Sequence, residues 1–390
     1  MRQPLLNRVG LSLLFLVPGE TGGVETYARR LTPALASAAP EIQFVAFVNE
    51  ETLESLDGGL AEGVETVPVR TSGRSRPRRV LAEQLRLPPL LRSHHIDLLH
   101  SMGTTAPSRP GVPSVVTLHD VIYASHPDAH TLMMRAGMRL LVPLAARSAD
   151  GVITVSNASA SEITRVLGIP SERIDVIYEG GLDPTAGTAE SELRERFSLG
   201  DAPVVLSVSA RRPHKNLARL LAAFSSVGSR PAPVLVLPGY STPFEDELEQ
   251  EAVRLGIDER VRKLGWVSQA DLEGLFGLAA CFVFPSLAEG FGLPVLEAMQ
   301  RGVPVACSRA SSLPEVAGDA ARYFDPLDTG DIQRALEELL EDRALAAGLA
   351  DAGRARAKSF SWERAARETI AVYERTWKRT AGAPDGEHPT

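Results

Sequence analysis

Short apolar runs alternate with helical patterns along this chain, and the alternation limits its possible folds more than any other feature. VGLSLLFLV (9–17) is followed by an amphipathic stretch from Gly23 to Ala38 and then by IQFVAFV (42–48). A buried strand, a helix and a second buried strand form a βαβ unit, which builds a parallel sheet. The same rhythm recurs with IDLLH (96–100), SVVTLHD (114–120) and GVITVS (151–156). Each run ends in small or polar residues, where ligands bind in open α/β sheets.

The rhythm lapses at EGGLDPTAGTAE (179–190) and then begins again, so the chain is expected to form two doubly wound domains. The second series of apolar runs comprises APVVLSVS (202–209), APVLVLPG (232–239), VRKLGWV (261–267), ACFVFPS (280–286) and VPVACS (303–308). Two helical patterns, Thr329 to Lys358 and Ser361 to Thr380, follow. A length of 390 residues agrees with two or three domains at about 150 residues each.

Composition excludes several classes of protein. The net charge of −8 argues against a general nucleic-acid binder, so any anion site must be local. The apolar run at 9–17 is about half the ~20 residues of a membrane-spanning helix, and we expect no signal peptide. Two cysteines, Cys281 and Cys307, cannot form a disulfide framework and lie in apolar runs. We therefore expect buried thiols and a cytoplasmic protein.

The segment FPSLAEGFGLPVLEAMQRGVP (284–304) carries the most chemical information. A strand is expected to end at Pro285, and Pro294 stands where the first turn of a helix would begin. Backbone N–H groups before such a helix favour an anion, and the carboxylates Glu289 and Glu297 suit sugar or ribose hydroxyls. Taken alone, the same residues also describe a helix N-terminus with acidic side chains near its dipole.

With Gly290, Phe291 and Gly292 between them, Glu289 and Glu297 resemble the E-x7-E signature of retaining family 4 glycosyltransferases. Three further segments resemble that family in the expected order: TGGVETYARRL (21–31), SARRPHKNL (209–217) and SLPEVAGDAARYFDP (312–326). Together the four matches span nearly the whole chain.

The resemblance implies a GT-B fold, with two Rossmann-like domains facing a central cleft and a C-terminal helix that crosses back to the N-terminal domain. The expected divisions are an acceptor-binding domain (1–182), a linker (183–200), a nucleotide-sugar-binding domain (201–360), a crossover helix (361–380) and a disordered tail (381–390). It also implies transfer of a hexose from a nucleotide diphosphate sugar, of the GDP-mannose or UDP-hexose type, to a hydroxyl of a glycan, lipid-linked or small-molecule acceptor.

Residue roles carry over from the matching motifs. The resemblance implies His119, Lys215 and Glu289 as catalytic residues, with the Lys215 ammonium stabilising the diphosphate leaving group. Outside the family context, His119 and Asp120 also fit a simple turn at a strand end. The implied donor-binding residues are Gly22, Gly23, Arg211, Arg212, Lys215, Glu289, Gly290, Phe291, Gly292, Leu293 and Glu297.

One departure from the family pattern concerns the arginine that precedes the basic-loop lysine by five or six residues. Ala210 and Ser209 occupy those positions, so Arg211 or Arg212 is expected to take the role, with Arg212 favoured. No Asp-x-Asp triplet and no His/Cys cluster with ligand spacing occurs, so we expect no metal or other cofactor. Retention of configuration implies attack from the face of the departing diphosphate, or a double displacement through a carboxylate or amide.

The segment 70–92 holds seven arginines against one acid, Glu83, in an otherwise acidic chain. It is a candidate site for an anionic acceptor or for peripheral contact with the inner membrane face, and a solvated loop fits it equally well. Two other functions remain open from sequence. A nicotinamide-dependent oxidoreductase shares the βαβ start, but the loop PGETGG (18–23) lacks G-x-G-x-x-G. The other is a noncatalytic sugar-nucleotide-binding protein on the same fold.

Overall fold

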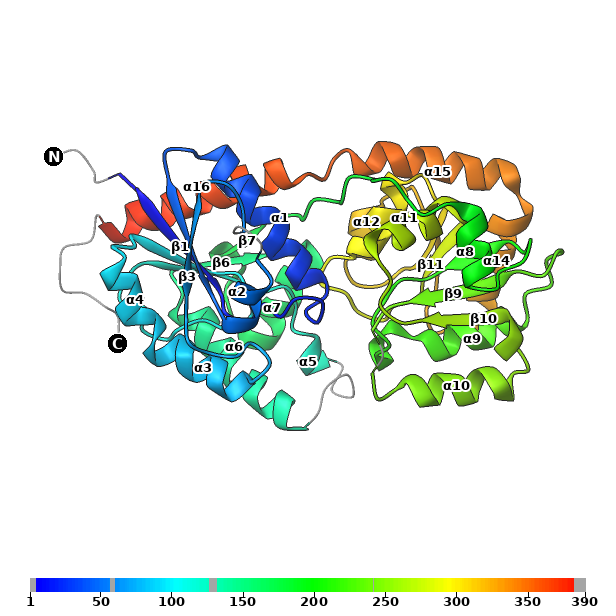
Figure 1. Ribbon diagram of the computed structural model, residues 1–390, viewed down its shortest axis with the longest axis horizontal. Coiled ribbons are helices and arrows are strands. Elements are labelled where there is room, and N and C mark those ends of the chain that lie inside the picture. Colours follow the sequence, from blue (N-terminus) through cyan, green and yellow to red (C-terminus); the bar gives the residue numbers. More distant parts are fainter. Residues whose placement is uncertain (1–4, 57–59, 126–131, 241, 382–390) are drawn as a thin grey trace. The chain divides into compact units, whose positions relative to one another are not determined.

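The computed structural model describes residues 5–56, 60–125, 132–240 and 242–381. Within them the chain forms two compact units (Figure 1). Of the described residues, unit 1 contains those up to Ser125, 132–180 and those from Ser361 onward, and unit 2 contains those within Gly181–Phe360. The chain thus leaves unit 1 and returns to it with its last helix.

Unit 1 is built on a parallel sheet of seven strands in the order β3-β2-β1-β4-β5-β6-β7. Its strands are β1 (Arg8–Leu13), β2 (Gln43–Val48), β3 (Val64–Pro68), β4 (Leu98–Ser101), β5 (Ser114–Thr117), β6 (Gly151–Thr154) and β7 (Ile174–Val176). Its helices are α1 (Gly23–Ala38), α2 (Glu50–Glu54), α3 (Arg76–Leu85), α4 (Leu87–Ser93), α5 (Ile122–Ser125), α6 (Leu132–Ser148), α7 (Asn157–Leu167) and α16 (Trp362–Ala381). The central strands are buried on both faces because helices cover the sheet, which explains their nearly continuous apolar runs.

Helix α16 returns to unit 1 and packs along α1 (Figure 1). Its Tyr373 is fully buried and its hydroxyl lies 2.6 Å from Nδ1 of His100 on β4. Near its C-terminal end, Thr376 is buried beside Gly151, where a Cβ would lie 3.0 Å from the threonine hydroxyl. These contacts make the last helix an integral part of unit 1.

Unit 2 repeats the architecture with six parallel strands in the order β10-β9-β8-β11-β12-β13. Its strands are β8 (Val204–Leu206), β9 (Val234–Pro238), β10 (Val261–Leu264), β11 (Ala279–Phe284), β12 (Val305–Ser308) and β13 (Arg322–Phe324). Its helices are α8 (Glu190–Arg196), α9 (Leu217–Ser225), α10 (Glu245–Arg254), α11 (Gln269–Leu278), α12 (Leu293–Gln300), α13 (Leu313–Ala317), α14 (Thr329–Glu341) and α15 (Arg343–Ala357). The expectation of two Rossmann-like parallel sheets is confirmed.

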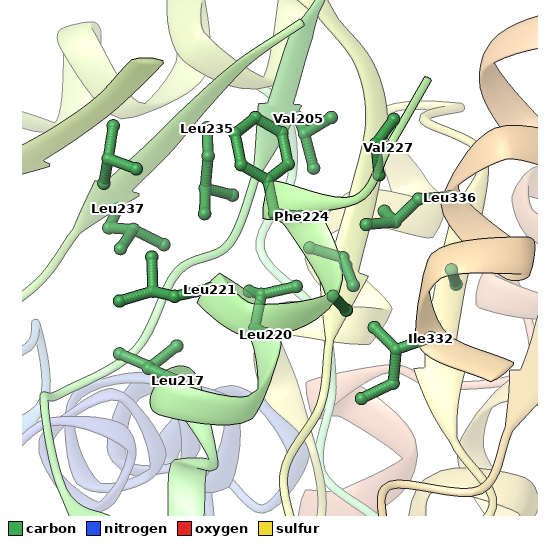
Figure 2. Packing of buried hydrophobic residues seen from close by; sticks show 14 of the residues in the cluster. Val205, Leu217, Leu220, Leu221, Phe224, Val227, Leu235, Leu237, Ile332 and Leu336 are labelled. Atoms are coloured by element: carbon green, nitrogen blue, oxygen red, sulfur yellow. The ribbon is translucent and has the colours of Figure 1, made fainter. Parts of the chain in front are cut away.

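The core of unit 2 fixes α9 against the sheet (Figure 2). Leu217, Leu220, Leu221 and Phe224 follow one another at helical spacing and all lie in the buried cluster. Figure 2 shows Phe224 between α9 and the strand residues Val205 and Leu235. Burial of each leucine stabilises the fold by about 1.5–3 kcal/mol. This packing matters for function because α9 begins just after the basic loop at 209–217.

Several elements differ from the sequence expectations. The strands β3, β7 and β13 were not expected, and all three lie at sheet edges, where partial exposure removes the apolar run. The helical pattern at 329–358 is two helices, because Asp342 caps α15 by accepting from the N–H groups of Ala344 and Leu345.

The segment expected as a linker, 183–200, carries α8. That helix buries Leu193 and packs against α11, so the later part of the segment belongs to the structure of unit 2. Of the tail at 381–390, all but Ala381 lies outside the described residues, and Ala381 ends α16.

Both cysteines are buried and unpaired by disulfides, as expected. Burial raises the pKa of the Cys281 thiol to about 12, and that of Cys307 also rises, so both are protonated at neutral pH. Across the described part of the chain, no helix combines the length and the apolar character that crossing a membrane requires.

Candidate active site

Two loops at the carboxyl edge of the unit 2 sheet bring opposite charges together. The basic loop after β8 ends in a short 3-10 helix, Pro213–Lys215, and the carboxylate loop, 285–292, follows β11. Lys215 Nζ lies 2.6 Å from Glu289 Oε1, which makes an ion pair between residues that are far apart in sequence. The strands β8 and β11 are neighbours in the sheet, so their carboxyl ends deliver both loops to one place.

Asn216 holds the two loops together. Its backbone is left-handed, with φ of 59°, a conformation that asparagine tolerates better than most residues. Its side-chain amide is buried and donates to the carbonyl oxygens of Pro285 at 3.0 Å and Pro326 at 2.8 Å. The N–H of Leu287 donates to the carbonyl of His214 at 2.8 Å. The position of Lys215 is therefore set by hydrogen bonds on both sides of it.

The carboxylate loop leads directly into α12. Gly292 has φ of 110°, a backbone conformation that favours glycine, and Pro294 stands in the first turn of the helix. Two adjacent serines at the start of α13 fix the loop from the other side, because Ser311 donates to the carbonyl of Glu289 and Ser312 to that of Phe291, each at 2.7 Å. An anchored loop before a helix N-terminus is a suitable place for an anion.

The charges at this edge remain partly accessible. The side chains of Lys215 and Glu289 are 17% and 10% exposed, and the Lys215 ammonium lies 5.5 Å from the centre of the Phe284 ring. Glu297 lies on α12 and is buried. A lysine ammonium can neutralise a phosphate, and carboxylates accept hydrogen bonds from hydroxyl groups. The edge thus offers groups for both parts of a sugar phosphate.

The two arginines of the basic loop have different surroundings. The Arg211 guanidinium is buried and contacts Glu245 at 2.9 Å, and it donates to the carbonyls of Leu237 at 3.1 Å and Leu264 at 2.5 Å. Burial lowers the pKa of Arg211. It therefore joins the ends of β9 and β10 to the start of α10. Arg212 is exposed.

The Gly-Gly motif of unit 1 lies at the start of α1. Gly22 precedes the helix with φ of 59°, and among the described residues no atom beyond its chain neighbours lies within 4 Å of where its Cβ would be. Glycine is thus required there by backbone conformation, and the space beside it is open. Gly23 is the first residue of α1.

His119 follows β5 and is enclosed in unit 1. Its Nε2 lies 3.0 Å from the carbonyl oxygen of Met102, and its Nδ1 lies 3.5 Å from Oε1 of Glu179. The His119 and Tyr27 rings are perpendicular in a T-shaped contact, with 4.7 Å between ring centres. Both His119 and Glu179 are buried, and burial raises the pKa of the Glu179 carboxyl.

A second buried polar chain lies beside His119. The Thr117 hydroxyl lies 3.0 Å from the hydroxyl of Tyr27 and 2.8 Å from Nε2 of His100, whose Nδ1 meets Tyr373. Burial, with a smaller contribution from the charge of His119, lowers the pKa of His100 to about 3. Four elements, α1, β4, β5 and α16, thus meet through neutral hydrogen-bonded groups.

Sequence reasoning assigned no role to several residues that hold these sites together. Asn216, Ser311 and Ser312 lie within or beside the motifs quoted above, so their proximity was visible although their contacts were not. Glu179 had one weak signal, since it is the one charged residue in VIYEGGL (176–182). Within the described ranges, no group of three or more His, Cys, Asp or Glu side chains is placed to hold a metal ion.

Comparison with known proteins matches the two units to two family models. Residues 21–180 match the model described as Glycosyltransferase Family 4, and residues 189–356 match Glycosyl transferases group 1. The Anabaena protein HepE, solved in complex with UDP and glucose, has a similar fold with a TM-score of 0.74 and 22% identity, over 95% of this chain and 100% of HepE.

Two curated relatives are mannosyltransferases by name. The chain is 34% identical over 267 residues to O-antigen chain mannosyltransferase B of Escherichia coli, which covers 67% of this chain and 70% of the relative. It is 33% identical over 240 residues to the MMP alpha-(1->4)-mannosyltransferase of Mycolicibacterium hassiacum, covering 60% of this chain and just over half, 56%, of that relative. With both units matched, the chain belongs to glycosyltransferase family 4 and has the GT-B fold.

Proposed function

We propose that this protein is a retaining hexosyltransferase that uses a nucleotide diphosphate sugar of the GDP-mannose or UDP-hexose type. The acceptor is a hydroxyl group of a glycan, a lipid-linked or a small-molecule substrate. The observation that carries the proposal is the Lys215–Glu289 pair at the carboxyl edge of the unit 2 sheet. The names of the two mannosyltransferase relatives favour mannose as the transferred sugar. The oxidoreductase alternative has no support among these relatives.

In this proposal the donor binds at the edge where Lys215 and Glu289 meet. The diphosphate takes Lys215 as its partner, with Arg212 assisting, since Arg211 is held by Glu245 and two carbonyls. Glu289 accepts hydrogen bonds from the sugar hydroxyls and Glu297 from those of the ribose. The backbone from Gly290 to Leu293 binds the donor at the start of α12, and Gly22 and Gly23 keep the donor-binding role that the family resemblance implies.

The transfer step breaks the bond between the anomeric carbon and the diphosphate oxygen. The acceptor oxygen forms the new bond on the same face, and its proton passes to the leaving phosphate oxygen. Lys215 and Arg212 stabilise the negative charge that develops on the diphosphate, so the reaction needs no resident metal ion. His119 acts near the transferred sugar.

The test is to incubate the purified protein with GDP-mannose and UDP-hexoses and a panel of hydroxyl acceptors, in the presence and absence of EDTA. We expect release of nucleoside diphosphate from one donor class, unchanged by EDTA, and NMR of the glycoside product should show the donor's anomeric configuration. Glu289→Gln should abolish turnover. Glu249→Gln is the matched control, because it also removes a lysine–glutamate pair of unit 2, with Lys263, at a more exposed position. Donor binding without turnover would instead establish a noncatalytic sugar-nucleotide-binding protein.

We further propose that this cytoplasmic enzyme contacts the inner membrane face through the segment 70–92. Along this segment, exposed arginines and leucines share one helical stripe that includes Arg78, Leu81 and Leu85, with the two leucines 59% and 65% exposed. Arg86 and Arg92 are also exposed. Exposed leucines flanked by arginines suit an anionic lipid surface, because arginines can pair with the charged headgroups and leucines can insert among the acyl chains.

Liposome flotation tests the membrane proposal. Vesicles that contain anionic phospholipid should retain the protein at low salt, vesicles of phosphatidylcholine alone should not, and raising the salt should release it. The double variant Leu81→Ala with Leu85→Ala should bind at least about fivefold more weakly. Failure to bind anionic vesicles at low ionic strength would refute membrane contact without affecting the proposed reaction.

A further inference from the structure

The buried contact between His119 and Glu179 has a geometry that specifies where protons lie. A carbonyl oxygen only accepts hydrogen bonds, so the 3.0 Å contact with Met102 requires that Nε2 of His119 carries a hydrogen. Nδ1 is the ring nitrogen left to face Glu179, at 3.5 Å. If both Nδ1 and the carboxylate lacked a proton, two lone pairs would face each other in a buried site.

No lysine or arginine of the described residues forms an ion pair with Glu179. Among the described residues, His119 is the single ion-pair partner of Glu179 within 4 Å. The titratable groups that face the His119 ring are Glu179, Tyr27 of α1 and His100 of β4, and Asp120 follows it in the chain. Burial raises the pKa of Tyr27 and lowers that of His100, which leaves both neutral at physiological pH. A buried carboxylate without a lysine or arginine depends on this one proton.

We infer that His119 and Glu179 hold one proton between them, and that Glu179 is the positioning residue that fixes the His119 ring for transfer. The inference rests on the proposed function for the role of His119, but not for the proton. The Nε2–H group donates to the Met102 carbonyl, and the shared proton lies between Nδ1 and the Glu179 carboxylate. These two contacts fix one orientation of the ring. Ser159 of α7 holds the backbone at this position, since its hydroxyl donates to the His119 carbonyl at 3.1 Å.

Glu179 also occupies a distinctive place in the chain. It precedes Gly180, the last residue before the chain leaves unit 1. A Cβ on Gly180 would lie 2.4 Å from the backbone nitrogen of Trp362, the first residue of α16, at which the chain has re-entered unit 1. Trp362 in turn lies edge-on to Tyr27, with 6.0 Å between ring centres. The His119–Glu179 pair thus lies next to the segment at Gly180, where the chain leaves unit 1, and to the segment at Trp362, where it re-enters.

The first experiment measures kcat/KM against pH for wild type and Glu179→Gln. Wild-type activity should fall at high pH as the pair loses its proton. The glutamine variant lacks the carboxylate that favours a charged ring, so its alkaline limb should move to lower pH by about one unit or more. Asp175→Asn is the control, because it makes the same change at an exposed residue earlier in the same segment, paired with Arg375. Superimposable profiles for wild type and Glu179→Gln would overturn the positioning role.

A double-mutant cycle separates positioning from general stability. If Glu179 acts through His119, Glu179→Gln should lower kcat/KM about tenfold in wild type and have almost no further effect in a His119→Gln background. A purely structural role would instead lower kcat/KM by the same factor in both backgrounds. Melting temperatures of all four proteins show whether each variant folds.

The second experiment does not depend on activity. Nitrogen-15 NMR of the full chain labelled at histidine, with the His119 signals assigned by their loss in His119→Gln, reports the protonation of both ring nitrogens. We expect Nε2 to stay protonated, and the protonation of Nδ1 to change in Glu179→Gln, because the carboxylate that faces it is lost. His119 ring-nitrogen signals that are unchanged in Glu179→Gln would refute the shared proton. This measurement tests the shared proton even in variants that have no detectable transferase activity.

Discussion

The two units use the same sheet architecture for opposite kinds of site. In unit 2, Lys215 and Glu289 are partly exposed charges carried by loops, and hydrogen bonds to backbone carbonyls hold those loops in place. In unit 1, His119 and its neighbours are buried, and they are held by one another and by the Met102 carbonyl. Exposed charges are available to a charged ligand, whereas enclosed groups keep a fixed orientation and protonation state. Under the proposed function, the site in unit 2 binds the donor and the site in unit 1 orients a side chain for transfer.

Replacing one core phenylalanine tests whether each unit depends on its own hydrophobic core for stability. Phe224→Ala should destabilise unit 2 by about 3–5 kcal/mol, since it empties a buried position behind α9 (Figure 2). Hydrogen exchange followed by mass spectrometry should show faster exchange in unit 2. Phe47→Ala, in the core of unit 1, is the matched control and should show the reverse. Equal acceleration in both units from either variant would contradict their independence.

Removal of the exposed cation should affect turnover far more than folding. Lys215→Ala should lower kcat by about 10²–10³-fold, because the developing negative charge on the diphosphate loses its nearest cation. Its melting temperature should stay within a few degrees of wild type, since a partly exposed ion pair adds little stability. Steady-state kinetics and calorimetry check both expectations. Wild-type turnover in this variant would refute the assignment of the donor site.

The buried network of unit 1 predicts instability in acid. His100 has a folded pKa of about 3, below its ordinary value of 6.5, so the unfolded chain binds a proton more readily than the folded one. Its contribution to stability is complete above pH 6.5 and declines toward pH 3, by about 1.4 kcal/mol per pH unit. Denaturant unfolding from pH 6.5 to 4.5 should show a steeper loss in wild type than in His100→Asn. Parallel slopes would show that His100 does not carry this effect.

The arginine pair gives the finest distinction between a binding and a structural role. Arg212→Ala should raise the KM for the donor about tenfold, equivalent to ~1.4 kcal/mol, with no change in melting temperature. Arg211→Met should lower the melting temperature, because it leaves the carbonyls of Leu237 and Leu264 and the Glu245 carboxylate without their partner. If Arg211→Met alone changed the donor KM, the two roles would be reversed.

Much of the fold was predictable because its signals are local. Strands buried on both faces, such as β1 and β11, read as apolar runs, and the glycine and proline of the carboxylate loop announce the start of α12. The edge strands β3, β7 and β13 were not predicted, because these partly exposed strands carry no continuous apolar run. The helix α8 was not predicted, because its short amphipathic pattern follows directly on a segment rich in glycine, proline and threonine.

The residue types and their spacing already specify two parallel sheets and the loops that carry the opposed charges of Lys215 and Glu289. They do not specify which of two adjacent arginines is buried, nor that Glu179 meets His119. Those outcomes depend on contacts between residues far apart in the chain, where the path of each strand decides which side chains share a desolvated space. A local pattern records how a segment folds, and burial of a charge is a property of everything packed around it.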